Sequence, residues 1–233
     1  MIEIKNLSKT FGSIKALDNI NLTIESGEIV ALLGPNGSGK TTLMRCLTGF
    51  IEQDKGSVSI FGKDTQAQRT KALKHIGYSL ENAALYPDMT VFEFLKFCAN
   101  MWDIPKDSIN SSIKRTTKAL NLENVITQKI DSLSKGFKKR VGIASAHIHN
   151  PEIVILDEPT EGLDPNQKLD LRELIKEQQG KKIILLSTHI MEEVSALATR
   201  VILIHKGKII KDAPIAEIAK EGDIYKYFKL LTK

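Results

Sequence analysis

The sequence contains little cysteine, few aromatic residues and no long hydrophobic run. Its two cysteines, Cys46 and Cys98, lie far apart, so we expect neither a disulfide framework nor a cysteine-based zinc site. The strongest apolar runs, 29–33 and 183–186, have the length of a strand, whereas a bilayer-spanning helix requires about 20 residues. The N-terminus has no basic segment followed by an apolar one, as a secretory signal would have. With 233 residues, the chain is expected to form one domain in a reducing cytoplasm.

Basic residues outnumber acidic ones by 33 to 28, and the excess is concentrated in one segment. Between Lys106 and Arg140, nine Lys or Arg residues stand against three Asp or Glu residues, which gives a local charge of +6. Such a segment either forms a solvated helical face or meets phosphates, nucleic acid or an anionic lipid surface. Aromatic residues do not alternate with these charges as in a single-strand binding groove, so we expect no nucleic-acid partner.

The hydrophobic pattern predicts an α/β fold. Apolar and polar residues alternate at 2–4 and 20–24, which favours an antiparallel sheet with one solvated face, whereas the unbroken run at 29–33 predicts a strand buried on both faces. Residues 91–148 have helical spacing, and strands alternate with helices again after Pro151. In that last part we expect strands at 153–156, 183–186 and 201–204 and helices at 165–179 and 190–197. The prediction is a single domain over 1–233, with a parallel-sheet core, an N-terminal antiparallel β-subdomain and an α-helical subdomain inserted at about 83–150.

A glycine-rich loop lies between the apolar strand at 29–33 and an expected helix at 40–47. The loop GPNGSGKT begins at Gly34 and matches G-x-x-x-x-G-K-[ST] in full, which predicts a P-loop NTPase (RecA-like) core. Its backbone N–H groups and the following helix N-terminus can bind phosphate, Lys40 can reach the β- and γ-phosphates, and Thr41 can bind Mg²⁺. The loop alone fits kinases, GTPases and ATPases equally. The residues expected to contact the nucleotide are Gly34, Pro35, Asn36, Gly37, Ser38, Gly39, Lys40, Thr41 and Thr42.

Two acidic residues end the apolar strand at 153–156. Asp157 is expected beside the phosphate loop, where a carboxylate can hold hydrated Mg²⁺. Glu158 extends toward the position of an attacking water, which a carboxylate can orient and deprotonate. In isolation, such a pair would more simply be a helix cap or a solvated turn. Together with the phosphate loop, it predicts nucleotide hydrolysis.

Four further elements follow one another in a distinctive order: LSKGF from Leu133, DEPT from Asp157, GLD from Gly162, and His189. With the phosphate loop, this order resembles the ATP-binding-cassette (ABC) family of ATPases over essentially the whole chain. The stretches IGYSLENAALYPDMTV and LSKGFKKRVGIASAHIHNPEIVILDEPTEGLDP resemble most closely the ATP-binding subunits of ABC-2-type exporters.

The resemblance implies a role for each matching residue. Phe11 would stack on adenine, although a buried aromatic at a strand end is the alternative. Ser134 and Gly136 would face the γ-phosphate bound by a second copy, while Asp164 would lie at the dimer interface. Both Ser134 and Asp164 could also serve simply as helix N-caps. His189 would contact the γ-phosphate, so the expected catalytic residues are Glu158, His189 and Lys40.

The sequence departs from the family pattern at three positions. Lys135 stands where the signature usually has glycine, and Phe137 where it has glutamine. Lys135 also occurs in the ABC-2-like subgroup, whereas Phe137 removes a polar group. The third is Glu81, at the position of a glutamine near the metal. We expect Thr41, Asp157 and Glu81 to be the metal ligands, with a surface glutamate as the alternative for Glu81.

The resemblance therefore implies an ATP-hydrolysing subunit of an ABC transporter, with ATP and Mg²⁺ as cofactors. It would form a homodimer on binding ATP and drive a separate integral membrane permease. Its expected location is cytoplasmic, peripheral on the inner face of the membrane. The main alternative is a soluble ABC ATPase that remodels or assembles another complex, and a more distant one is a P-loop kinase or a nucleic-acid-bound ATPase.

Overall fold

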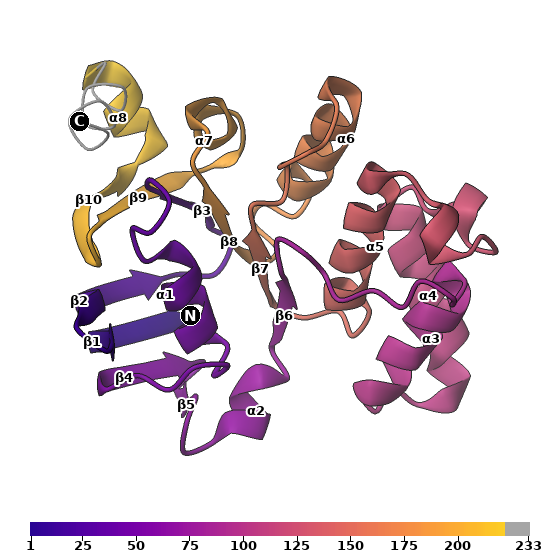
Figure 1. Cartoon of the computed structure of the whole chain (residues 1–233), viewed down its shortest axis with the longest axis horizontal. Helices are drawn as coiled ribbons and strands as arrows, with labels where there is room; N and C mark the ends of the chain where they lie inside the picture. Colours follow the sequence, from indigo (N-terminus) through magenta and orange to yellow (C-terminus); the bar gives the residue numbers. More distant parts are fainter. Residues whose placement is uncertain (222–233) are drawn as a thin grey trace.

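The computed structural model describes residues 1–221, which form two β-sheets with helices around them (Figure 1). The strands are β1 (Ile2–Phe11), β2 (Ile14–Ile24), β3 (Ile29–Leu33), β4 (Lys55–Ile60), β5 (Lys63–Asp64), β6 (Ile76–Ser79), β7 (Ile153–Asp157), β8 (Ile183–Thr188), β9 (Arg200–His205) and β10 (Lys208–Pro214). The helices are α1 (Lys40–Leu47), α2 (Arg69–Leu73), α3 (Val91–Met101), α4 (Lys106–Ala119), α5 (Lys135–His147), α6 (Pro165–Lys176), α7 (Met191–Leu197) and α8 (Ile215–Glu221), with short 3-10 turns at Glu123–Val125 and Ile130–Ser132.

The core sheet has the strand order β10-β9-β3-β8-β7-β6, and only the β9–β10 pair is antiparallel. Strand β3 is buried on both faces, as its unbroken apolar run predicts. Ala31 and Leu33 belong to one hydrophobic cluster, and Val30 and Leu32 belong to the other. This two-sided burial holds the end of β3, where the phosphate loop begins, in a fixed position.

The N-terminal sheet is antiparallel, with the order β2-β1-β4-β5. Ile2 pairs with Ile24 and Ile4 pairs with Leu22, and all four side chains are buried. Helix α1 packs against this sheet, since its apolar residues share a cluster with those of β1 and β2. The predicted antiparallel sheet with one buried face is therefore confirmed.

Helices α3, α4 and α5 form the part of the molecule farthest from the N-terminal sheet (Figure 1). Helix α3 begins with a capping box in which Thr90 Oγ1 accepts from the Glu93 N–H while the Glu93 carboxylate accepts from the Thr90 N–H. Helix α5 lies so close to β6 that a Cβ atom at Gly77 would overlap the Ala146 carbonyl oxygen. These helices lie within the predicted insert, whose limits at about 83–150 and whose membership of a single domain over 1–233 stay predictions.

Two details differ from the sequence-based prediction. Helix α6 ends at Lys176 rather than at 179, because the chain turns before Gly180, whose φ is 75°. Strands β4, β5, β6 and β10 and helices α2 and α8 were not predicted. Strands β5, β6 and β10 lie at sheet edges, the two helices are short, and β4 depends on pairing with β1 and β5. Among residues 1–221, none of the helices combines the length and the apolar composition of a membrane span.

Candidate active site

The phosphate loop connects β3 to α1 and is held by close backbone approaches. Gly39 has a φ of 111°, and a Cβ atom there would lie 2.6 Å from the Ala16 carbonyl oxygen. The Gly207 N–H donates to the Ser38 carbonyl oxygen at 2.9 Å, which ties the loop to the β9–β10 turn. The loop therefore has a fixed shape, with the N-terminus of α1 directed into it.

Lys40 is almost completely buried at the start of α1. Its Nζ donates to the carbonyl oxygens of Gly34 at 2.7 Å and Pro35 at 3.2 Å, and it lies 3.9 Å from Glu158 Oε1. Burial lowers the pKa of the Lys40 ammonium, while the negative charges of Glu158 and Asp157 oppose that shift. A buried cation whose partners are mostly neutral carbonyls is well suited to bind an anion.

The two carboxylates at the end of β7 have different surroundings, although both are buried. Asp157 Oδ1 accepts a hydrogen bond from Ser187 Oγ at 2.5 Å, and the Glu158 N–H donates to the same Ser187 oxygen at 2.9 Å. Glu158 has a φ of 45°, a left-handed conformation that is costly for a residue with a side chain. Through these two hydrogen bonds, Ser187 on β8 holds the strained turn at Glu158. The turn directs the Glu158 side chain away from β7.

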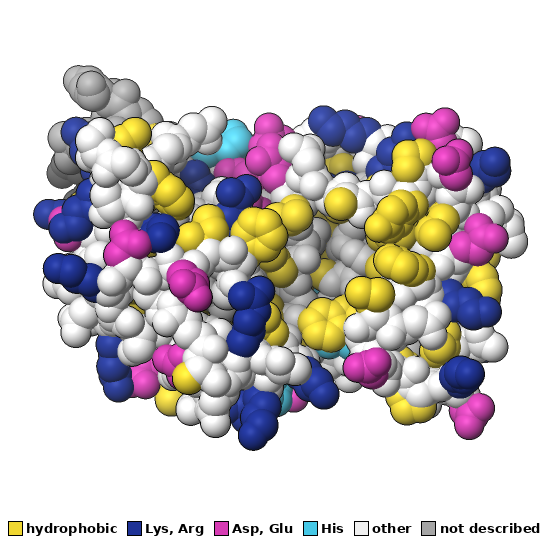
Figure 2. Space-filling view, turned by 60° about the horizontal axis from the view of Figure 1, so that its bottom comes forward, with side chains coloured by type: hydrophobic (Ala, Val, Ile, Leu, Met, Phe, Trp, Pro, Cys, Tyr) yellow, Lys and Arg dark blue, Asp and Glu magenta, His cyan; other side chains and the backbone are white. Residues whose placement is uncertain are grey.

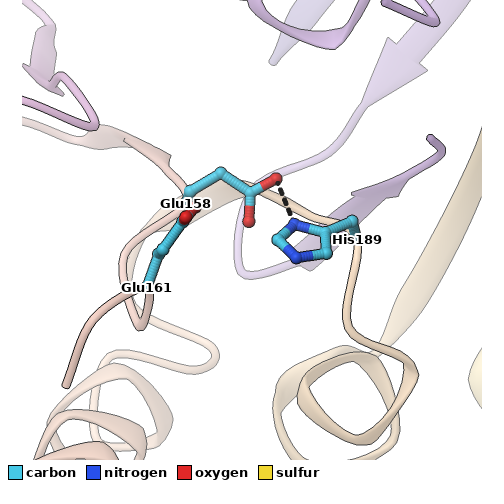
Figure 3. A group of neighbouring side chains, drawn as sticks. All are labelled: Glu158, Glu161 and His189. Carbon is cyan, nitrogen blue, oxygen red and sulfur yellow. Dashed lines mark ion pairs between the residues drawn. The ribbon is translucent and has the colours of Figure 1, made fainter. Parts of the chain in front are cut away.

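The Glu158 side chain points toward His189, which follows β8 (Figure 3). The distance from His189 Nδ1 to Glu158 Oε1 is 3.1 Å. Glu161 lies beside them, because the Glu161 N–H donates to the Glu158 carbonyl oxygen at 3.3 Å in a tight turn. Residues that directly follow β7 and β8, about 30 positions apart in the sequence, therefore lie next to each other.

A cavity of about 520 Å³ joins Glu158 and Glu161 to the phosphate loop. Glu81 lies on its wall together with Glu158, so the structure brings Glu81 to the site where the sequence predicted it. The Glu81 side chain is exposed. The lining residues are Ile14, Lys15, Ala16, Asn36, Gly37, Ser38, Gly39, Lys40, Thr41, Thr42, Glu81, Glu158, Glu161 and Lys206.

The donors around this cavity fit a magnesium ion by their chemistry. The predicted ligands Thr41, Asp157 and Glu81 offer one hydroxyl and two carboxylates, and Mg²⁺ prefers oxygen ligands of this kind. Thr41 and Glu81 line the cavity, whereas Asp157 is buried behind the Glu158 turn with one oxygen bound by Ser187. The assignment of these three residues as ligands stays a prediction.

Lys139 on helix α5 contacts the site from the helical side. Its Nζ donates to the Glu81 carbonyl oxygen at 2.7 Å. Burial lowers the pKa of the Lys139 ammonium, and the charges of Glu81, Asp157, Glu161 and Glu158 oppose that shift. Lys139 thus links the α5 helix to the acidic side of the cavity.

The remaining predicted residues do not line this cavity. Ser134 and Asp164 are N-caps: Ser134 Oγ accepts from the Phe137 N–H at 3.3 Å and Asp164 Oδ1 from the Gln167 N–H at 2.9 Å. Gly136 packs against the Gln167 side chain, so the starts of α5 and α6 lie together. The capping alternative is present for both residues, and it is compatible with a role at an interface.

Phe11 ends β1 with 46% of its surface exposed, which excludes the alternative of a buried strand-end aromatic. Its neighbour across the hairpin, Ile14, lines the cavity, but Phe11 does not. Stacking of Phe11 on adenine stays a prediction.

The two unusual signature residues have specific packing partners. The Lys135 side chain lies directly over Gly162, where a Cβ atom would overlap it. The Phe137 ring lies 5.6 Å from the Arg140 guanidinium, and Arg140 pairs with Asp170 on α6 at 2.7 Å. The side chain that replaces a polar one at position 137 therefore contributes to the contact between α5 and α6.

Sequence reasoning missed Ser187, Lys139, Glu161 and Lys206. Three of them take their places through tertiary contacts: Ser187 through Asp157, Lys139 through Glu81, and Lys206 through the turn that binds the phosphate loop. Only Glu161 had a local signal, since it lies three residues after Glu158 in the same acidic turn.

Comparison with known proteins identifies the family. The family model for the ABC transporter matches residues 17–161, which is more than half of the chain. The chain belongs to the ABC transporter family. It is an ATP-binding, ATP-hydrolysing cassette with the P-loop NTPase fold, and the fold class predicted from the sequence is confirmed.

Individual relatives agree with this assignment. An uncharacterized ABC transporter ATP-binding protein of Bacillus subtilis, YdbJ, is 40% identical over 95% of this chain and 70% of its own length. The bacitracin transport ATP-binding protein BcrA of Bacillus licheniformis is 34% identical over 99% of this chain and 75% of its own. A dimeric ATP-binding cassette solved with ADP and Pi after hydrolysis has a TM-score of 0.83 at 27% identity, covering 92% of this chain and 99% of that one.

Proposed function

We propose that this ABC cassette hydrolyses ATP as a dimer with a second copy and drives a separate membrane permease of the exporter type. The observation that carries the proposal is the single cavity in which the phosphate loop faces Glu158 and Glu81. The relatives named for bacitracin transport and the dimeric cassette support the exporter role and the dimer.

Within the cavity, each side chain has a distinct task. Lys40 would exchange the Gly34 and Pro35 carbonyl oxygens for the β- and γ-phosphates, because charged acceptors bind an ammonium more strongly than carbonyls do. Glu158 would orient and deprotonate the attacking water, and His189 would contact the γ-phosphate. Thr41, Asp157 and Glu81 would hold Mg²⁺, which neutralises phosphate charge when bound.

Ser134, Gly136 and Asp164 do not line this cavity, which supports a role in a second copy's site. The N–H groups at the start of α5 and its partial positive charge suit a γ-phosphate presented from outside. Phe11 would complete the adenine side of the same chain's site.

A groove of about 300 Å³ offers a surface for the permease. It lies between β6 and α2 on one side and α3 and α5 on the other, and is lined mainly by apolar and aromatic residues, including Tyr78, Met101 and Trp102. Phe50 and Met101 expose about 70% of their surface. Figure 2 shows hydrophobic side chains gathered around a hollow on this face. Exposed apolar clusters of this kind mark interaction sites, and they support a location at the inner face of the membrane.

Hydrolysis by the purified chain tests the enzymatic part. Lys40→Ala should abolish phosphate release and greatly weaken ATP binding, whereas Lys55→Ala, which removes an exposed lysine of β4, should leave both unchanged. Near-normal turnover in Lys40→Ala would reject the site. Phosphate transfer to an acceptor other than water would favour a kinase instead.

Recovery from detergent-solubilised membranes tests the transport part. The chain should copurify with a polytopic membrane protein, and Met101→Glu should weaken that association because it places a charge in the apolar groove. Leu169→Glu is the matched control, since Leu169 is an exposed apolar residue on α6 away from the groove. Copurification with a soluble complex instead would support the alternative of a non-transport ABC ATPase.

A further inference from the structure

Three side chains with metal-binding atoms meet at the edge of the cavity. Glu158, Glu161 and His189 each offer one ligand atom, and these atoms lie within 4.8 Å of one another (Figure 3). The two glutamates come from one tight turn, and the histidine comes from the segment after β8. The group is separate from the predicted magnesium ligands Thr41, Asp157 and Glu81.

The contact between His189 and Glu158 is unusual. His189 Nδ1 is inaccessible to solvent and, among residues 1–221, has no partner with hydrogen-bond geometry, although Glu158 Oε1 is only 3.1 Å away. Two electron-rich atoms at this distance repel each other unless a proton or a cation lies between them. Ligand atoms bound at about 2.0–2.1 Å to a tetrahedral metal are about 3.3 Å apart, so the observed spacing suits a shared metal ion.

The donor set and its exposure favour an ion of the zinc class. An imidazole nitrogen with two carboxylate oxygens suits Zn²⁺ and similar transition metals, whereas Mg²⁺ prefers oxygen ligands alone. More than nine-tenths of the Glu158 side chain is buried, which gives one fixed ligand. His189 exposes 40% of its side chain and Glu161 is exposed, so water can complete the coordination. Lys40 Nζ, at 3.9 Å from Glu158 Oε1, opposes the bound cation and keeps its affinity moderate.

We propose that, in the nucleotide-free chain, Glu158, Glu161 and His189 bind one Zn²⁺ or chemically similar ion. Bound there, the metal engages the carboxylate that orients water and the histidine directed to the γ-phosphate, so it inhibits ATP hydrolysis. The inhibition rests on the proposed function, whereas the binding does not. Glu161 completes the set, because without it only two protein ligands remain.

Calorimetric titration of the nucleotide-free full chain with Zn²⁺ tests the binding. We expect one equivalent bound, with the affinity lowered about tenfold or more in Glu161→Gln. Co²⁺ used in place of Zn²⁺ should give visible absorption without a thiolate band, because Cys46 is buried and the three ligands contain no sulfur.

His75→Gln is the matched control. His75 Nδ1 lies 3.2 Å from Glu152 Oε2, which is a similar pair without a third ligand in the group. Its replacement should leave Zn²⁺ binding unchanged. Wild-type affinity in Glu161→Gln, loss of binding in His75→Gln, or a thiolate band with Co²⁺ would each overturn the proposed site.

The inhibition is measured as the ratio of hydrolysis rates with and without Zn²⁺ at excess Mg²⁺, taken within each variant. We expect a ratio well below one for the wild type and a ratio closer to one for Glu161→Gln. Equal ratios in the two proteins would overturn the inhibition. If the wild type hydrolyses no ATP even without Zn²⁺, the proposed function fails, while calorimetry still decides whether the metal site exists.

Discussion

At the scale of single residues, two buried or half-buried lysines set the charge around the cavity. Lys40 occupies the phosphate loop, where its Nζ contacts backbone carbonyl oxygens. Lys139 on α5 donates to the carbonyl oxygen of Glu81, a residue that lines the cavity. Burial lowers the pKa of both ammonium groups, and the negative charges of nearby carboxylates oppose that shift. Lys40 on α1 therefore places a positive charge in the cavity, together with Lys15 and Lys206, while Lys139 on α5 contacts the segment that carries Glu81.

We predict that Lys139→Gln lowers kcat/KM for ATP by about fivefold, equivalent to the ~1 kcal/mol of one hydrogen bond. The substitution removes the hydrogen bond to the Glu81 carbonyl oxygen and a positive charge that acts on the Glu81 carboxylate. Steady-state kinetics should show a partial recovery in the double variant with Glu81→Gln, which removes the uncompensated charge.

The neighbouring Lys138→Gln is the control for this experiment. Lys138 Nζ donates to the Asp131 carbonyl oxygen at 2.8 Å, so its replacement removes an equivalent contact away from the phosphate loop. Equal losses in the two single variants, or no recovery in the double variant, would show that Lys139 acts only through stability.

At the scale of elements, the sequence predicts best where one local pattern settles the outcome. The run at 29–33 predicts a strand buried on both faces. Strand β3 has this burial, because its alternate residues belong to the two hydrophobic clusters on opposite sides of the sheet. The phosphate loop, with its G-x-x-x-x-G-K-T spacing, is found between β3 and α1 as predicted. The positions of Lys139 and Ser187 could not be predicted, because both depend on how α5 and β8 pack against other strands. Likewise, β4 depends on pairing with β1 and β5, which its local sequence does not indicate.

Helices α3 and α6 both begin with a capping box. A comparison of the two caps can therefore separate a loss of stability from a loss of activity. Asp164→Ala and Thr90→Ala should each lower the free energy of unfolding by about 1 kcal/mol, because each removes an N-cap acceptor. Denaturant titration measures this loss. At 25 °C, where both variants remain folded, only Asp164→Ala should also reduce ATP hydrolysis, since Asp164 is predicted to lie at the dimer interface. Equal rates of ATP hydrolysis in the two variants would show that Asp164 acts only as a helix cap and has no role at the dimer interface.

At the scale of the whole molecule, the residues predicted to form one ATP site lie on two separate surfaces. The phosphate loop, Glu158 and Glu81 line one cavity, whereas Ser134, Gly136 and Asp164 lie where α5 meets α6. One copy therefore presents a phosphate-binding cavity and, separately, a helix N-terminus suited to an anion. Two copies arranged head to tail would complete both sites.

This arrangement predicts a specific effect of Ser134→Arg. The arginine would place bulk where the second copy's γ-phosphate docks, so dimerisation should be lost while each monomer still binds ATP. Light scattering and nucleotide titration measure the two properties separately. An intact dimer in this variant would show that the start of α5 is not at the interface.

The most direct test of the shared-site account is the mass of Glu158→Gln with ATP, measured by size-exclusion chromatography with light scattering. The substitution removes the predicted base and keeps the shape of the side chain, so ATP should stay intact. The account predicts a monomer of 25.9 kDa without nucleotide and a species of twice that mass when ATP is added. A monomer that persists with ATP at high protein concentration would contradict it.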